Sequence, residues 1–183
     1  REIRVCRGGK SSKTALRTLL GQMDGSNFPI HADDLPSKIE SVRSLDQYLN
    51  NQPFKTLRKQ LNHPGGGDAY RIEEDGVSVA YITDNELDPP SELSTTYDEW
   101  DEFCEGVDLL IHDAQYIEND MPAKHGWVHS LFSLVSQLAV DAQGRKLVMY
   151  HHDPERSDRE LDEIAVESAR FFKSQSSSIG SYI

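Results

Sequence analysis

Three apolar segments of the sequence each end in ionisable side chains, and this recurring pattern constrains the fold more than any other feature. They are VAYITDNE (79–86), LLIHDAQY (109–116) and KLVMYHHDP (146–154). Short apolar runs that end at turn-forming residues are typical of buried strands. Because each segment delivers its ionisable residues at the C-terminal end, we expect a site at one edge of a sheet.

The rest of the chain mixes strand and helix patterns. Glu74-Asp75-Gly76 is a hairpin signal, and Ser157 with Glu160 forms a capping box. Strands are expected at 2–6, 38–43, 54–61, 69–73, 77–83, 108–112 and 146–150, and helices at 13–23, 96–106, 130–142 (capped by Ser130) and 157–172. This order predicts a two-layer or four-layer α/β fold. Residues 1–174 are expected to form one domain, with 175–183 as a loose, low-complexity tail.

Composition excludes some classes of partner. The net charge of −12 argues against salt-driven nucleic-acid binding and against an anionic membrane surface, so a nucleic acid is not the favoured partner. No apolar run approaches the length of a membrane span, and no secretory segment opens the chain.

Cys6 and Cys104 form no CxxC pair, and Cys6 is expected to be a small buried hydrophobe. A reducing, cytoplasmic setting is expected.

Three residues have the chemistry and flanks of metal ligands. His63, Asp84 and His151 each follow an extended segment and precede a turn. Imidazoles and carboxylates bind Zn²⁺, Mn²⁺ or Fe²⁺, and a carboxylate can bridge two such ions and so help to activate a shared water. Each residue alone is more often a turn or cap residue. The hypothesis of a metal site therefore rests on the three together.

Asp113 and His129 form a second candidate pair. A carboxylate that accepts from one imidazole nitrogen orients the ring and favours its protonated form. Such a histidine can act as a general acid toward a leaving oxygen, or can bind a phosphoryl oxygen. The equally weighted alternative is that His129 only packs beside Trp127.

A phosphate-binding loop is a weaker hypothesis. Gly8-Gly9-Lys10-Ser11 lies between an expected strand and an expected helix, but the nucleotide-binding pattern requires a glycine where this chain has Arg4. In that hypothesis Asp84 or Asp113 would position magnesium. A glycine turn followed by a helix cap is the favoured interpretation.

Taken in order, several motifs resemble a known family. NHPGGGDAYRIEEDG, VAYITDNE, DLLIHDAQY, HGWVHS and KLVMYHHDPERSD together closely resemble the later two thirds of metallo-β-lactamase-fold hydrolases. The similarity covers roughly residues 1–170 and is nearest to the branch of ribonuclease Z and phosphodiesterase-type members. It implies an αββα sandwich of the α/β class, with two divalent metal ions at one edge of its two sheets.

The resemblance assigns roles to single residues. His63 matches the third metal histidine, Asp84 the bridging aspartate and His151 the last metal histidine. Asp113 and His129 match the pair of an acid and a histidine that serves catalysis, with slightly different spacing. The implied cofactors are two divalent ions, Zn²⁺ foremost, with Mn²⁺ or Fe²⁺ as alternatives.

The HxHxDH motif that defines the family has no match in this chain, since the segment 31–34 has the wrong spacing. We therefore expect the sequence to be the C-terminal part of a longer protein, with about 80 or more residues preceding it. The chain alone is expected to bind metal weakly and to be inactive.

The function implied by the resemblance is metal-dependent hydrolysis of a phosphodiester or related ester by metal-bound hydroxide. A small molecule or a phosphodiester is the expected substrate, and the sequence does not indicate an oligomeric state. The alternative is a non-catalytic sensor or interaction module that keeps the fold with a degenerate metal motif. Loops 24–36, 86–96 and 116–128 are expected to select the substrate, with Tyr116, Lys124 and Trp127 facing it.

Overall fold

The computed structural model describes residues 2–5, 17–18, 20–26, 28–41 and 45–183, which form two compact units, 1–53 and 54–183. The first unit contains two parallel strands, β1 (Glu2–Val5) and β2 (Lys38–Ser41), with the 3-10 helix η1 (Ala32–Asp34) and helix α2 (Leu45–Leu49). Cys6, the glycine-rich loop 8–11 and much of the helix predicted at 13–23 lie outside the described residues.

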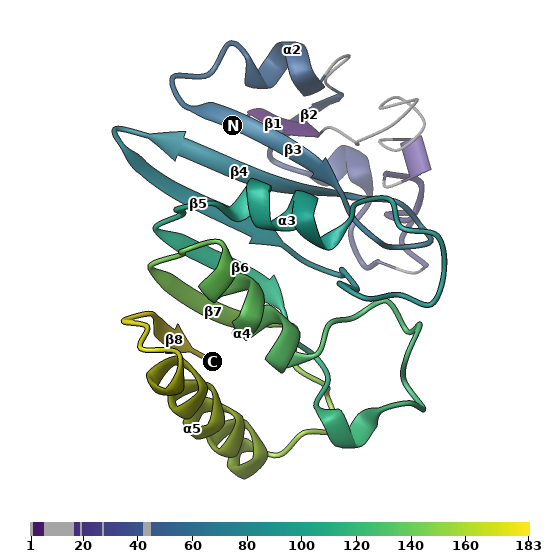
Figure 1. Cartoon of the computed structure of the whole chain (residues 1–183). Helices are drawn as coiled ribbons and strands as arrows, with labels where there is room; N and C mark the ends of the chain where they lie inside the picture. Colours follow the sequence, from purple (N-terminus) through teal and green to yellow (C-terminus); the bar gives the residue numbers. More distant parts are fainter. Residues whose placement is uncertain (1, 6–16, 19, 27, 42–44) are drawn as a thin grey trace. The chain divides into compact units, whose positions relative to one another are not determined.

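The second unit is built on one six-stranded sheet with the strand order β3-β4-β5-β6-β7-β8 (Figure 1). Pairing is antiparallel from β3 to β5 and parallel from β5 to β8. The predicted hairpin is present between β4 and β5, and Gly76 at its turn has a φ of 79°. The strands are β3 (Lys55–Gln60), β4 (Asp68–Glu74), β5 (Val77–Ile82), β6 (Leu109–Asp113), β7 (Lys146–Tyr150) and β8 (Gly180–Tyr182).

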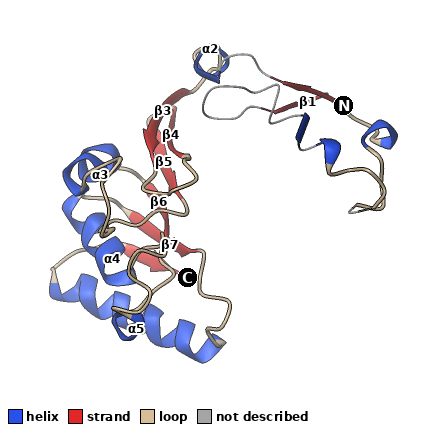
Figure 2. Cartoon of the chain, turned by 90° about the vertical axis from the view of Figure 1, so that its right-hand side faces the viewer, coloured by secondary structure: helices blue, strands red, loops and turns tan. Residues whose placement is uncertain are grey.

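Three helices cover one face of this sheet: α3 (Tyr97–Cys104), α4 (Phe132–Asp141) and α5 (Asp158–Ser174) (Figure 2). The apolar stripes of the helices meet alternate residues of the strands, which form the core. Trp100 of α3 is fully buried there and packs edge-on against Phe103. Helices α3 and α5 both begin with a capping box, and the one at Ser157 and Glu160 was predicted.

Two local expectations differ from the structure. The segment 175–183, expected to be a loose tail, contains β8, which pairs in parallel with β7. Ser130 does not cap α4, whose N-cap is Leu131 without a side-chain hydrogen bond. The Ser130 hydroxyl instead donates to the carbonyl of Asn85 at 2.6 Å and accepts from the N–H of Leu87 at 3.1 Å. Ser130 thus bonds to residues that are distant in sequence, and local sequence does not encode such contacts.

No helix among the described residues is both long enough and apolar enough to span a membrane.

Candidate metal and acid–base site

The C-terminal ends of three parallel strands bring the candidate residues together. Because β5, β6 and β7 are neighbours that run in the same direction, their ends meet at one edge of the sheet. Asp84 follows β5, Asp113 ends β6, His151 follows β7, and His129 comes from the loop before α4. Each of these four residues offers one ligand atom, and these atoms all lie within 4.8 Å of one another.

Asp113 and His129 are directly hydrogen bonded. The distance between Asp113 Oδ2 and His129 Nδ1 is 2.5 Å, and the Asp113 side chain is 0% exposed. The backbone N–H groups of Asn85 and Gln115 also donate to this carboxylate, each at 3.2 Å. A carboxylate with these three donors has a fixed position and in turn fixes the plane of the His129 ring.

The pairing also changes the acidity of His129. Burial by itself lowers the pKa of His129, but the hydrogen bond and negative charge of Asp113 raise it, with smaller contributions from Asp84 and Glu86. The net effect is a pKa above the ordinary value for histidine. With Nδ1 bound to Asp113, Nε2 is the ring nitrogen left to carry a proton toward a ligand.

His151 is held in the orientation that a metal ligand needs. Its Nδ1 donates to the side-chain oxygen of Gln115 at 3.0 Å, while its Nε2 lies 3.2 Å from Asp84 Oδ1. An imidazole whose outer nitrogen donates to an oxygen is the usual arrangement behind a metal ion. The ring also stacks on His129, with 4.7 Å between the ring centroids. Asp84 and His151 thus offer an oxygen and a nitrogen toward the same point, which fits a divalent cation such as Zn²⁺.

The backbone around the cluster is strained. Asp84 and His151 have φ values of 50° and 60°, and Val128, which directly precedes His129, has a φ of 67°. Residues other than glycine rarely adopt this left-handed region, and a β-branched residue is an outlier there. Such strain costs on the order of 1 kcal/mol or more per residue and persists only where the surrounding contacts enforce it.

Glu86 supplies one of those contacts, and sequence analysis did not assign it a role. The residue is 3% exposed, and its carboxylate accepts from the N–H of Gly126 at 2.7 Å and from the N–H of Val128 at 3.0 Å. Glu86 therefore holds the loop that carries His129. Because glutamate is by default a surface residue, nothing in the sequence marked this one as buried.

Asn62 joins the other loops of the site. Its amide nitrogen donates to the carbonyls of Glu86 and Thr95, and its amide oxygen accepts from the N–H groups of Ser94 and Thr95. Four hydrogen bonds satisfy this buried amide completely. The bonds tie the segment before His63 to the loop that follows β5.

Among the described residues, the four-residue group does not include His63. The imidazole Nδ1 accepts from the N–H of Gly65 at 3.1 Å, which leaves Nε2 for other partners. His63 lines a cavity with Asn62, Glu86 and Val128. Its role as a metal ligand stays a prediction.

The three residues expected to face a substrate have different surroundings. Tyr116 is 2% exposed and packs edge-on against His129, with 5.8 Å between ring centroids. Lys124 Nζ lies 2.5 Å from Asp153 Oδ2 and 5.1 Å from the centre of the Tyr116 ring. Trp127 is 63% exposed. Direct contact with a substrate stays a prediction for all three, and Trp127 is the one most open to solvent.

The sequence matches no protein-family model and no curated protein. Solved structures do match. The metallo-beta-lactamase fold protein YhfI from Bacillus subtilis has 18% sequence identity and a TM-score of 0.62 over 99% of this chain and 62% of its own length. Human tRNase Z, short form, has 17% identity and a TM-score of 0.51 over 99% of this chain and 64% of its own. A diphosphatase from the PhnP family has 14% identity and a TM-score of 0.54 over all of this chain and 56% of its own.

The chain thus spans between 56% and 64% of the length of these neighbours. At such low identity the matches bear on the fold. The resemblance predicted an αββα sandwich, and the second unit has the layout of one half of it, a mixed sheet with helices on one face and ionisable residues at the ends of its parallel strands. The chain has the metallo-β-lactamase fold.

Proposed function

We propose that the protein containing this chain is a metal-dependent hydrolase that cleaves a phosphodiester or a related ester. The observation that carries the proposal is the four-residue group, in which the candidate metal ligands Asp84 and His151 lie beside the hydrogen-bonded pair of Asp113 and His129. The structural neighbours include a tRNase and a diphosphatase, which supports the same class of reaction.

A divalent cation, Zn²⁺ foremost, would be held by Asp84 and His151, with His63 a further expected ligand. When bound, such an ion supplies Lewis-acid chemistry that activates water near neutral pH and polarises a phosphoryl oxygen. Because His151 Nδ1 donates to Gln115, Nε2 is the ring nitrogen that would be available to hold the ion. Two ions are expected in the whole protein, as the resemblance implies.

His129 is the proposed general acid. The carboxylate of Asp113 keeps its ring oriented and raises its pKa, so a larger fraction of His129 carries a proton at neutral pH. The proton at Nε2 is transferred to the leaving oxygen as the ester bond breaks. Two backbone N–H groups and the His129 ring all donate to the Asp113 carboxylate, so its position and the orientation of the ring stay fixed.

The proposal is tested on the full-length protein by metal analysis and by hydrolysis of bis-p-nitrophenyl phosphate. We expect His129→Ala to lower kcat by about 10²–10⁴-fold with metal content unchanged. Asp84→Ala should lose both metal and activity. His31→Ala, at an exposed histidine of the first unit, is the matched control and should change neither.

A full-length protein that binds no metal, or that hydrolyses the ester equally well after Asp84→Ala, would contradict the proposal. The first result would favour a non-catalytic sensor or interaction module.

A further inference from the structure

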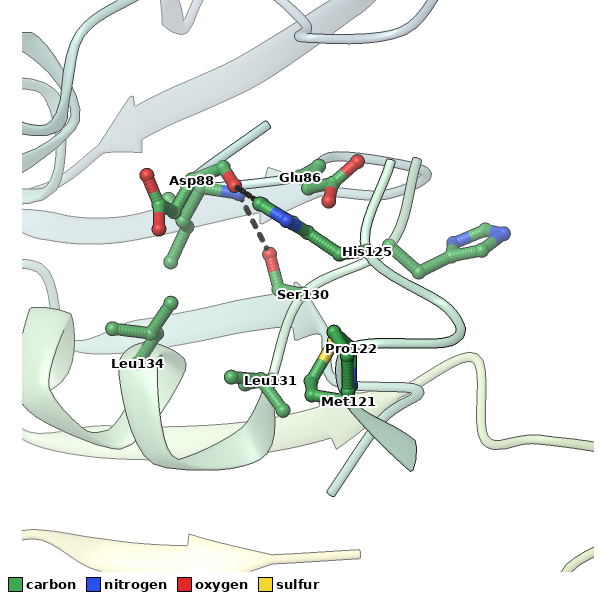
Figure 3. Close-up of a pocket in the computed structure, with 10 residues that line it drawn as sticks. Glu86, Asp88, Met121, Pro122, His125, Ser130, Leu131 and Leu134 are labelled. Atoms are coloured by element: carbon green, nitrogen blue, oxygen red, sulfur yellow. Dashed lines mark hydrogen bonds between the residues drawn. The ribbon is translucent and has the colours of Figure 1, made fainter. Parts of the chain in front are cut away.

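Figure 3 shows a small pocket with Ser130, Leu131 and Leu134 among the residues around it. His129 also lines this pocket. Its volume is about 180 Å³. It is lined mainly by apolar side chains from the loop after β5, the loop before α4 and the first turn of α4. These are Leu87, Met121, Pro122, Leu131 and Leu134.

Hydrogen bonds fix the walls of this pocket. Ser130, one of its lining residues, bonds to both Asn85 and Leu87 and so joins the two loops. Glu86 holds the loop at Gly126 and Val128. Since these bonds form within the protein, the pocket exists before a ligand arrives, which reduces the entropy lost on binding.

The size and polarity of the pocket define the group that it accepts. An apolar cavity of about 150 Å³ binds benzene, so this pocket has room for one aromatic ring. Glu86 and Asp88 are among its lining residues, and the negative charge of their side chains disfavours an anion. The imidazole Nε2 of His125 donates to the carbonyl of Asp88 at 2.7 Å, so this nitrogen is also engaged. The pocket therefore suits a neutral ring.

His129 connects the pocket to the four-residue group, because it belongs to both. A ring in the pocket places the oxygen attached to it next to the imidazole that is proposed to protonate the leaving group. We propose that this pocket binds the neutral aromatic ring, aryl or heterocyclic, of the leaving group. The substrate class is then a phosphodiester in which the leaving group is joined to phosphorus through an oxygen on an aromatic ring. The catalytic part of this inference rests on the proposed function, whereas the binding of the ring does not.

Binding is tested on the 183-residue chain by following its backbone amide resonances during a titration with phenol, which is neutral at pH 7. We expect weak binding, with a Kd on the order of millimolar, because phenol has few atoms to contribute contacts. The shifts should centre on residues 129–134. Methyl phosphate, an anion without a ring, should cause no shifts there.

Leu134→Phe places a second ring in the pocket and should weaken phenol binding by about tenfold or more. Val166→Phe is the matched control, since Val166 is an exposed residue of α5, and it should bind phenol like the parent chain. Met121→Phe fills the pocket from another wall. It replaces Leu134→Phe in the phenol titration if circular dichroism shows that Leu134→Phe does not fold. Unchanged phenol binding in the folded pocket variants, or shifts centred on Tyr81 and Tyr150 of the opposite sheet face, would overturn the proposal.

Activity of the metal-loaded, full-length protein separates this inference from the proposed function. We expect Leu134→Phe to raise KM for bis-p-nitrophenyl phosphate by about tenfold with kcat nearly unchanged. Phenol binding without hydrolysis by the parent protein would support the pocket and refute the proposed function. Hydrolysis with the same KM in parent and variant would refute the pocket and leave the proposed function standing.

Discussion

At the scale of single residues, the site depends on buried carboxylates with different tasks. Asp113 orients His129 directly, whereas Glu86 accepts from the N–H groups of Gly126 and Val128 and so positions the loop that carries His129. Because Val128 has a φ of 67°, the loop stores strain that the Glu86 carboxylate holds in place. Glu86 is thus a positioning residue.

Glu86→Gln should destabilise the protein by about 1–3 kcal/mol, because the amide offers one acceptor oxygen to two donors. Adding Val128→Gly should recover part of this loss, since glycine adopts a positive φ without strain. Denaturant unfolding of the single and double variants measures both effects. The contrary outcome is that Val128→Gly lowers the free energy of unfolding of the Glu86→Gln variant as much as, or more than, that of the parent. Glu86 would then not offset strain at Val128.

The ion pair of Lys124 and Asp153 gives a pH-dependent prediction. The hydrogen bond from Lys124 lowers the pKa of Asp153 below its ordinary value, and the Asp153 side chain is 8% exposed. Ionised Asp153 therefore stabilises the fold fully at pH values above the ordinary pKa of aspartate. This stabilisation is lost as the pH falls through the lowered pKa of Asp153 in the folded protein.

Asp153→Asn should cost about 1–2 kcal/mol at pH 7, and the difference from the parent should shrink below about pH 4. Thermal unfolding at several pH values measures it. Glu163→Gln, at an exposed ion pair with Arg159, is the control and should change stability little. A deficit that stays constant down to pH 3 would contradict the assignment of the pKa shift to Asp153.

At the scale of secondary structure, the elements that sequence analysis located are those with a strong periodic pattern. Strands β5, β6 and β7 are apolar runs, and α5 has both a capping box and an apolar stripe, so local physics defines them. Strand β8 has no such pattern. Gly180–Tyr182 becomes a strand because it lies beside β7, and pairing of this kind between distant segments is invisible in a short window of sequence.

Deleting residues 180–183 should therefore lower stability by about 1–3 kcal/mol, because it leaves the outer edge of β7 without a partner. A fall in Tm of about 2–4 °C per kcal/mol is expected for a chain of this size. The control is Gln175→Ala at an exposed position after α5, which should leave Tm nearly unchanged. An unchanged Tm after the deletion would show that β8 adds nothing to the sheet.

At the scale of the whole molecule, the site is only partly encoded in local sequence. Asp84, Asp113 and His151 could be found because each follows an apolar strand, and parallel strands bring their ends together. His129 was found through its flanking motif. Glu86 and Ser130 could not be found, because their partners lie some 40 residues away in sequence and no local pattern reports such a contact.

The chain also spans less than two thirds of its structural neighbours, so the metal site has to be examined in the full-length protein. The most direct measurement is an anomalous difference map at the zinc absorption edge, from crystals of the full-length protein grown with Zn²⁺. We expect a peak between Asp84 and His151, within about 2.0–2.2 Å of an Asp84 oxygen and of His151 Nε2. The absence of a peak there, with zinc bound elsewhere or not at all, would contradict the assignment of this cluster as a metal centre.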